Sequence, residues 1–212
     1  MKYNEKGVLA VVSGFSGAGK GTLMKALLDR YEEYALSISM TTRRMRIGEV
    51  DGESYFFVSR ETFLEKIEQE DFIEHACYCD NYYGTPKAYV EQQLEHGKNV
   101  ILEIEIQGAL KIKEQYPEAL LLFVMPPNAE ELKSRLMGRG TETDEVIHQR
   151  LQRAVQEAEG IEEYDYFVVN DILDTCVEEI HRIIHLSHNQ PNRNKEFINH
   201  IREELTSFSE RG

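Results

Sequence analysis

A glycine-rich turn that directly follows an apolar run constrains this chain more than any other feature. The run Val8-Leu9-Ala10-Val11-Val12 predicts a buried strand, and the segment Gly14-Phe15-Ser16-Gly17-Ala18-Gly19-Lys20-Gly21-Thr22 comes straight after it. Glycines let the backbone turn tightly and direct several N–H groups into one concavity, and a following helix adds its positive end. Lys20 supplies a mobile cation for the outer phosphates. The segment is therefore interpreted as a P-loop that binds a nucleoside triphosphate.

One position of this loop departs from the usual pattern. Gly21 stands where P-loops carry Ser or Thr, whose hydroxyl ligates magnesium. Because glycine has no side-chain oxygen, either Thr22 is re-aimed or the ion is held by phosphates, water and a carboxylate from elsewhere. A glycine-rich turn without function is the alternative interpretation, but strand, loop, lysine and the helical pattern Leu23-x-x-x-Leu27-Leu28 fall in the required order.

The composition limits the class of protein. A chain of 212 residues, 41% hydrophobic and 29% charged, fits one α/β domain. It has no apolar run near the roughly 20 residues that cross a bilayer, and its start lacks the apolar core of a signal peptide. Three cysteines are too few for a disulfide scaffold, and their spacing predicts no metal site. We expect a cytoplasmic protein without a membrane partner.

The net charge of −14 disfavours nucleic acid as a partner, since phosphates would meet a repulsive average field. Two concentrations of positive charge then become informative. They are Arg43-Arg44-x-Arg46 and the group Arg135, Arg139, Arg150 and Arg153. Both could attract small phosphates, and for both the alternative is a solvated face with i, i+4 ion pairs.

Strands and helices alternate along most of the chain. Strands are expected at residues 7–13, 36–39, 55–58, 72–74, 100–106, 120–124 and 166–169. Helices are expected at residues 20–33, around Phe63 to Ile67, from Thr85-Pro86 to Gly97 with the Thr85 hydroxyl as cap, after Pro127 with Asn128 as cap, and after the last strand to about 187. This alternation predicts a parallel sheet with helices on both faces, whose ligands gather at the carboxyl ends of the strands.

Several segments together resemble the guanylate kinase family. They are Gly14-Phe-Ser-Gly-Ala-Gly-Lys20, Ser39-x-Thr41-Thr42-Arg43-x-x-Arg46-x-Gly48-Glu49, Phe72-Ile73-Glu74, Asn81-Tyr82-Tyr83-Gly84-Thr85, Glu103-Ile104-Glu105-Ile106-Gln107-Gly108, Gly138-Arg139-Gly140 and Val169-Asn170-Asp171. The resemblance covers about residues 7–187. It implies transfer of the γ-phosphoryl group of ATP to GMP (and dGMP), with magnesium.

The implied fold is a P-loop three-layer α/β/α domain with a parallel core sheet, a small mixed GMP-binding excursion and a helical lid. On this basis residues 1–188 form the domain and 189–212 a helical tail. Within the domain, the core takes in 7–38, 86–134 and 160–188, the excursion 39–85 and the lid 135–159. Phe197, Ile201, Leu205 and Phe208 give the tail an apolar face. That face is expected on the domain or on another subunit, so a homo-oligomer remains open.

The chemistry of guanine agrees with the acceptor site that the resemblance implies. Guanine presents an acceptor at O6 and donors at N1 and N2, so its pocket needs hydroxyl donors and carboxylate acceptors. By resemblance, Glu74 and Glu105 accept from the N1/N2 edge, and Ser39 and Thr85 bind the rest of the base. Arg43, Arg46, Tyr55 and Tyr83 hold the GMP phosphate, and Glu103 is also placed in the GMP site. Half-buried strand tyrosines and a simple helix cap are the structural alternatives for Tyr55, Tyr83 and Thr85.

The resemblance also implies the donor and transfer residues. ATP lies on the P-loop and near Asn170, and the catalytic residues are Lys20, Arg43, Arg135, Arg139 and Arg150, with the last three in the lid. Magnesium rests mainly on nucleotide phosphates and water, with Glu103 as the nearest protein candidate. Arg153 is not required by the resemblance and is expected on the surface. A catalytically silent protein-binding module and a kinase for another nucleoside monophosphate are the competing functions.

Overall fold

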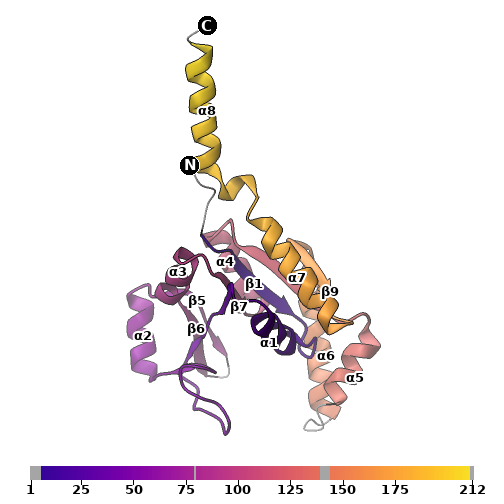
Figure 1. Cartoon of the computed structure of the whole chain (residues 1–212). Coiled ribbons are helices and arrows are strands. Elements are labelled where there is room, and N and C mark those ends of the chain that lie inside the picture. Colours follow the sequence, from indigo (N-terminus) through magenta and orange to yellow (C-terminus); the bar gives the residue numbers. More distant parts are fainter. Residues whose placement is uncertain (1–5, 79, 139–143, 211–212) are drawn as a thin grey trace.

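A parallel sheet forms the centre of the molecule, as the alternation of strands and helices predicted (Figure 1). The structure is a computed structural model that describes residues 6–78, 80–138 and 144–210. All neighbouring strands of the central sheet run parallel. Their order is β2 (Tyr34–Leu36), β7 (Asn99–Glu103), β1 (Leu9–Gly14), β8 (Leu120–Met125) and β9 (Tyr166–Val169).

Helices cover both faces of this sheet. Successive side chains of a strand point to opposite faces. In β1, Ala10 and Val12 therefore lie in one apolar cluster, while Leu9 and Val11 lie in another. No helix in the described part of the chain is long and apolar enough to cross a membrane. The first cluster is covered by α1 (Lys20–Arg30) and α7 (Leu173–Ser187), and the second by α3 (Lys87–Glu95) and α4 (Ile106–Gln115).

The excursion carries a small mixed sheet of its own. It stands to one side of the central sheet in Figure 1, together with α2 (Arg60–Glu68), whose first turn is capped by the Ser59 hydroxyl. One pair of its strands is parallel and two pairs are antiparallel. The strand order is β4 (Phe56–Phe57), β3 (Met40–Thr41), β6 (Asn81–Pro86) and β5 (Phe72–Tyr78).

Two helices of the predicted lid region lie on the other side of the central sheet (Figure 1). They are α5 (Ala129–Met137), capped by Asn128 as predicted, and α6 (Asp144–Ala158). Leu132 and Leu136 of α5 share an apolar cluster with Ile147 and Ala154 of α6, and Phe15 of the P-loop packs against it. The lid helices therefore contact the P-loop directly. A short 3-10 turn, η1 (Ile161–Glu163), leads from α6 to β9.

The tail forms a helix, as predicted, and the C-terminal part of its apolar face is exposed. After the turn η2 (Pro191–Arg193), α8 (Lys195–Ser209) projects away from the body (Figure 1). Leu205 and Phe208 are 63% and 71% exposed, and α8 contains no buried residue. The anchored part is the turn before it, where Arg193 donates from Nη2 to the Gly7 carbonyl at 2.7 Å.

Three local predictions were wrong. The strand expected at 36–39 is β2 and ends at Leu36. The strand expected at 100–106 ends at Glu103, and α4 begins at Ile106. Thr85 does not cap α3: it lies in β6, and Pro86 precedes the helix without a side-chain cap.

Candidate active site

The P-loop joins β1 to the N-terminus of α1 and encloses a cavity of about 290 Å³. In this structure the Lys20 ammonium donates to the carbonyls of Gly14, at 2.8 Å, and Phe15, at 3.3 Å. The cavity thus combines a helix N-terminus with a lysine, which is the arrangement that binds phosphate. It is lined by Ser16, Gly17, Gly19, Lys20, Gly21, Thr22 and Glu103.

Glycine is required at some positions of this loop and not at others. Gly19 has φ 88°, and a Cβ there would lie 2.6 Å from the Asn170 amide nitrogen. A Cβ at Gly14 would lie 2.1 Å from the Val124 carbonyl oxygen. Among the described residues, a Cβ at Gly21 would meet nothing within 4 Å beyond its own chain neighbours and the backbone of α1. Packing therefore does not exclude a serine at Gly21.

Asn170 and Arg135 hold the outer side of the P-loop. The buried Asn170 amide donates to the Ala18 carbonyl at 2.8 Å. Arg135 donates to the same carbonyl at 3.3 Å and to the Asn170 carbonyl at 2.9 Å, while its Nε donates to Glu131 at 2.7 Å. Arg135 is thus engaged with the loop backbone in this structure.

Two carboxylates and a hydroxyl meet where the guanine site was predicted. The fully buried Thr85 hydroxyl donates to Glu74 Oε1 at 2.8 Å. Glu105 caps α4, accepting from the backbone N–H groups of Gly108 at 2.8 Å and Gln107 at 3.1 Å. A Cβ on Gly108 would lie 3.4 Å from Glu74 Oε2 and 3.5 Å from Glu105 Oε1. Both acids therefore border the same small space above the start of α4.

Burial raises the pKa of the Glu74 carboxyl above its ordinary value. The Thr85 hydrogen bond acts in the opposite direction, and the nearby charge of Glu105 raises the pKa further. A carboxylate in this position gains from any ligand that brings N–H donors to it. Ser39, also predicted here, is half-buried next to β3, and its carbonyl accepts from Phe56 N–H at 2.9 Å.

The predicted phosphate residues of the excursion surround Arg43. Its guanidinium forms a two-pronged pair with Glu49, at 2.7 and 3.1 Å. The hydrogen bond to Glu49 raises the pKa of Arg43, and the same bond lowers the pKa of Glu49. The Tyr55 ring lies 5.4 Å from the guanidinium carbon and 6.1 Å from the Tyr83 ring. Arg46 is exposed, and its backbone N–H donates to Glu49 at 2.7 Å.

A second cavity, of about 260 Å³, connects the P-loop with the loop that follows β7. Glu103 lines both this cavity and the first one. The Glu103 residue is exposed. Desolvation by the surrounding protein nevertheless raises the pKa of its carboxyl, and the charge of Lys20 acts in the opposite direction. The lining is Gly14, Ser16, Lys20, Glu103, Ile104, Glu105, Ile106, Arg153 and Glu157.

Helix α6 brings one arginine to the P-loop and another to this second cavity. Arg150 donates from Nη1 to the Ser16 hydroxyl at 3.3 Å, so it contacts the P-loop. Arg153 is exposed, as expected, and it also lines the cavity. Arg139 lies outside the described residues.

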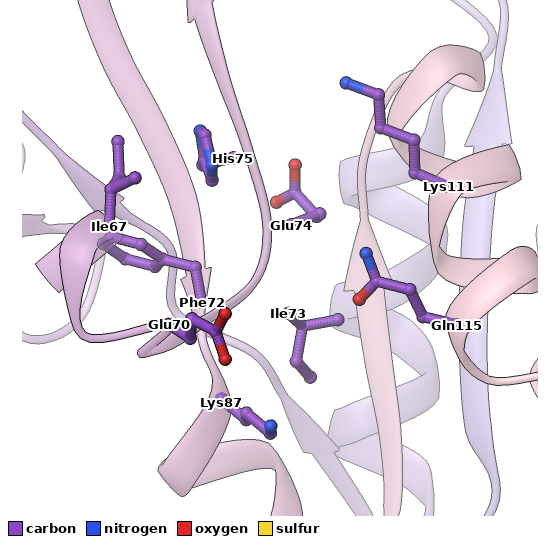
Figure 2. A pocket seen from close by; sticks show the side chains of 9 residues that line it. All are labelled: Ile67, Glu70, Phe72, Ile73, Glu74, His75, Lys87, Lys111 and Gln115. Atoms are coloured by element: carbon purple, nitrogen blue, oxygen red, sulfur yellow. The ribbon is translucent and has the colours of Figure 1, made fainter.

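A third cavity, of about 410 Å³, separates the excursion from α4. Figure 2 shows Glu74 between His75 and the α4 residues Lys111 and Gln115. Burial lowers the pKa of His75, and the Lys111 charge lowers it further. The same charge opposes the burial that raises the pKa of Glu74. Because no P-loop residue lines this cavity, it adjoins the base site and is separate from the phosphate cavities.

Sequence reasoning assigned no role to Glu49 or Glu157, and it placed Arg153 on the surface. Glu49 stood inside a quoted motif, and its spacing from Arg43 gives no periodic signal for a pair. For Arg153 and Glu157 a signal was present, because an i, i+4 pair on the helix of Arg150 lies on the same face as that arginine.

Comparison with known proteins points to one family. The model of the family described as guanylate kinase matches residues 6–187. A guanylate kinase from Caldanaerobacter subterraneus is 48% identical over 96% of this chain and 99% of its own length. One from Clostridioides difficile is 50% identical over 92% and 96%. The crystal structure of guanylate kinase from Anaplasma phagocytophilum has a TM-score of 0.72 and 33% identity, covering 90% of this chain and 91% of that one.

Proposed function

The chain belongs to the guanylate kinase family and phosphorylates GMP with ATP, and on this premise we propose how its residues divide the reaction. Residues 39–85 bind GMP, the P-loop binds ATP, and residues 135–159 close over both. The comparisons favour neither a silent binding module nor a kinase for another nucleoside monophosphate.

The contact between Thr85 and Glu74 carries the assignment of the acceptor base. Since the Thr85 hydroxyl fixes Oε1, Oε2 of Glu74 borders the space shared with Glu105. Guanine N1–H and N2–H can donate to these two carboxylates, and the Ser39 hydroxyl supplies a donor for O6. Adenine has no donor at N1, so it would leave a buried carboxylate without a partner. Sites of this kind discriminate by about 10⁴ to 10⁵. The 2′-hydroxyl is not part of this readout, so dGMP is also a substrate.

The acceptor phosphate binds at the Arg43 cluster. Arg43 and Arg46 provide guanidinium donors, and Tyr55 and Tyr83 provide hydroxyl donors. Because Arg43 already pairs with Glu49, the incoming phosphate must compete with that carboxylate or share the guanidinium with it.

On the donor side, Lys20 leaves the Gly14 and Phe15 carbonyls and binds the outer phosphates of ATP. Arg150 acts on the transferring group from α6, and Arg139 is proposed for the same role. Arg135 and Asn170 secure the loop on its outer side, where adenine would lie. The transfer asks the protein mainly for in-line positioning and positive charge.

Magnesium fits the P-loop cavity. In the described part of the chain, a Cβ at Gly21 would have no atom within 4 Å beyond its chain neighbours and the backbone of α1. Glu103 lines the same cavity as Lys20 and Thr22. We propose that phosphates and water hold the ion mainly, with Glu103 as the nearest protein ligand. When bound, magnesium neutralises charge on the phosphate oxygens.

A kinase assay with five acceptors tests the base assignment. With ATP and magnesium, the purified protein should phosphorylate GMP fastest and dGMP more weakly. AMP, CMP and UMP should be slower in kcat/KM by about 10⁴ or more. Lys20→Ala is the inactive control. Equal turnover of AMP would contradict the guanine pocket, and an active Lys20→Ala protein would contradict the donor site.

A further inference from the structure

The second cavity lies between the proposed donor and acceptor sides, and two residues that line it, Arg153 and Glu157, have no role in the proposal above. One side consists of P-loop residues, including Ser16 and Lys20, and the opposite side consists of residues 103–106. Arg153 and Glu157 of α6 close the space between them. A phosphoryl group that moves from ATP on the P-loop to GMP beside Glu105 crosses this cavity.

Glu157 fixes the direction of Arg153. The Arg153 Nε donates to Glu157 Oε1 at 2.9 Å, one helical turn further along α6. The Glu157 side chain is only 16% exposed, so it is well held, and its Oε2 is buried without a hydrogen-bond partner among the described residues. The Arg153 side chain is 45% exposed. The guanidinium carries further N–H donors on its two terminal nitrogens.

Arg153 lies one turn after Arg150, on the same face of α6. Arg150 contacts Ser16 on the donor side. Arg153 shares its cavity with Glu103 and Ile106, which lie towards the acceptor. The two arginines therefore approach the path of the phosphoryl group from successive positions.

We propose that Arg153 is a further catalytic residue: from the acceptor side of the cavity, it binds the phosphoryl group during its transfer from ATP to GMP. Glu157 is its positioning residue. In the step, the bond from the γ-phosphorus to the β,γ-bridging oxygen breaks and its electron pair stays on ADP. At the same time an oxygen of the GMP phosphate forms the new bond to that phosphorus. This inference rests on the donor and acceptor sides assigned above.

The charges around the cavity explain why a positive side chain is needed at Arg153. Glu103, Glu105 and Glu157 place negative charge around a path that a phosphoryl group must cross. Lys20 offsets that charge on the donor side. Without Arg153, the described residues that line this cavity towards the acceptor would be acidic or apolar. A guanidinium there stabilises charge on the equatorial oxygens.

Replacement of Arg153 tests the proposal. Arg153→Gln should lower kcat for GMP phosphorylation by about 10- to 100-fold, the range for one charged hydrogen-bonding contact, and change each KM by less than threefold. Arg153→Lys should fall between this variant and the parent, since it keeps the charge without the fork. The matched control is Arg182→Gln, an exposed arginine on α7, which should keep full activity.

Binding of a bisubstrate provides a readout that a structural role would not give. The probe is adenosine and guanosine joined by five phosphates, measured by titration calorimetry. Arg153→Gln should weaken this probe at least tenfold while it leaves GMP alone within threefold. In a double-mutant cycle, Glu157→Ala should lower kcat in the parent and have little further effect in Arg153→Gln.

Three results would overturn the proposal. One is a kcat for Arg153→Gln within twofold of the parent. Another is a lower kcat accompanied by an equal loss of thermal stability in both Arg153→Gln and Arg153→Lys. The third is full additivity of the Arg153 and Glu157 variants. Failure of the donor and acceptor assignment would show separately, as a parent protein that does not prefer GMP or does not need Lys20.

Discussion

Thr85→Val removes one hydroxyl from the proposed base site and nearly nothing else. Valine has almost the same shape, and Thr85 has no exposed surface. The lost bond is the 2.8 Å contact to Glu74 Oε1, and a hydrogen bond to a charged group contributes about 1.5–3 kcal/mol. For a chain of this size, 1 kcal/mol corresponds to about 2–4 °C in Tm. The melting temperature near neutral pH should therefore fall by about 3–12 °C.

The pH dependence of this loss follows from the pKa of Glu74. Burial already raises it, and loss of the Thr85 bond raises it further. The stability difference is greatest at a pH above the raised pKa of Glu74, where the carboxylate is ionised in both proteins. As the pH falls through the two raised pKa values, the carboxyls become protonated and the difference narrows. As the pH is lowered, the KM for GMP should also begin to rise at a higher pH in Thr85→Val than in the parent.

Thermal unfolding followed by circular dichroism, near neutral pH and in mild acid, measures this effect. Thr206→Val is the matched control, since its exposed hydroxyl donates to the Arg202 carbonyl on the projecting helix α8. Its melting temperature should stay within about 1–2 °C of the parent. A Thr85→Val protein that melts with the parent near neutral pH, or whose deficit grows in acid, would refute the reasoning.

Two further substitutions test the acids and glycines of the site. Glu74→Gln should raise the melting temperature near neutral pH, because burial raises the folded-state pKa and the ionised carboxylate destabilises the fold as pH increases through it. This gain in Tm should vanish below the unfolded-state pKa of about 4.3. The kcat/KM for GMP should fall at least a hundredfold. A Tm difference from the parent that does not change with pH would contradict the predicted effect of the Glu74 charge. Gly21→Ser should fold normally and need less magnesium for half-maximal rate, because its hydroxyl has room beside the phosphates; an unchanged magnesium requirement would contradict the placement of the ion.

The core of the fold could be predicted because its signals are local and repeated. The apolar run of β1, the glycine loop and Lys20 follow one another without interruption. The strand β9 and the amphipathic helix α7 were predicted at nearly their observed bounds, since period and length agree there. A parallel sheet then follows from the alternation of the elements.

Two predictions failed because the side chain concerned can form either of two local structures. Residues 102–106 alternate in polarity as a strand does. The Glu105 carboxylate, however, accepts from the N–H groups of Gln107 and Gly108 and so starts a helix. Thr85 before Pro86 has the pattern of a helix cap, but its hydroxyl donates to Glu74 on the neighbouring strand. In both cases a contact made after folding selects between patterns that the sequence permits equally.

The contacts of the arginines lay further beyond the reach of the sequence. Spacing identified Arg135, Arg150 and Arg153 as a concentration of charge. It could not say that Arg135 holds the P-loop backbone, that Arg150 contacts the Ser16 hydroxyl, or that Arg153 lines a cavity. That division depends on how α5 and α6 pack on Phe15. The exposure of Leu205 and Phe208 on α8 could not be predicted either. An amphipathic pattern is the same whether or not another surface covers its apolar face.

The pair of Arg43 and Glu49 has a consequence for selectivity among anions. A cell contains inorganic phosphate, chloride and many metabolites that could settle on an uncovered guanidinium. In this protein any such ion must compete with a bidentate carboxylate that is tethered nearby and is therefore always present at high local concentration. A nucleotide whose base is also bound has the same advantage of tethering, and a free ion does not. At the proposed acceptor site, the ion pair would thus act as an intramolecular competitor against anions that arrive without guanine attached.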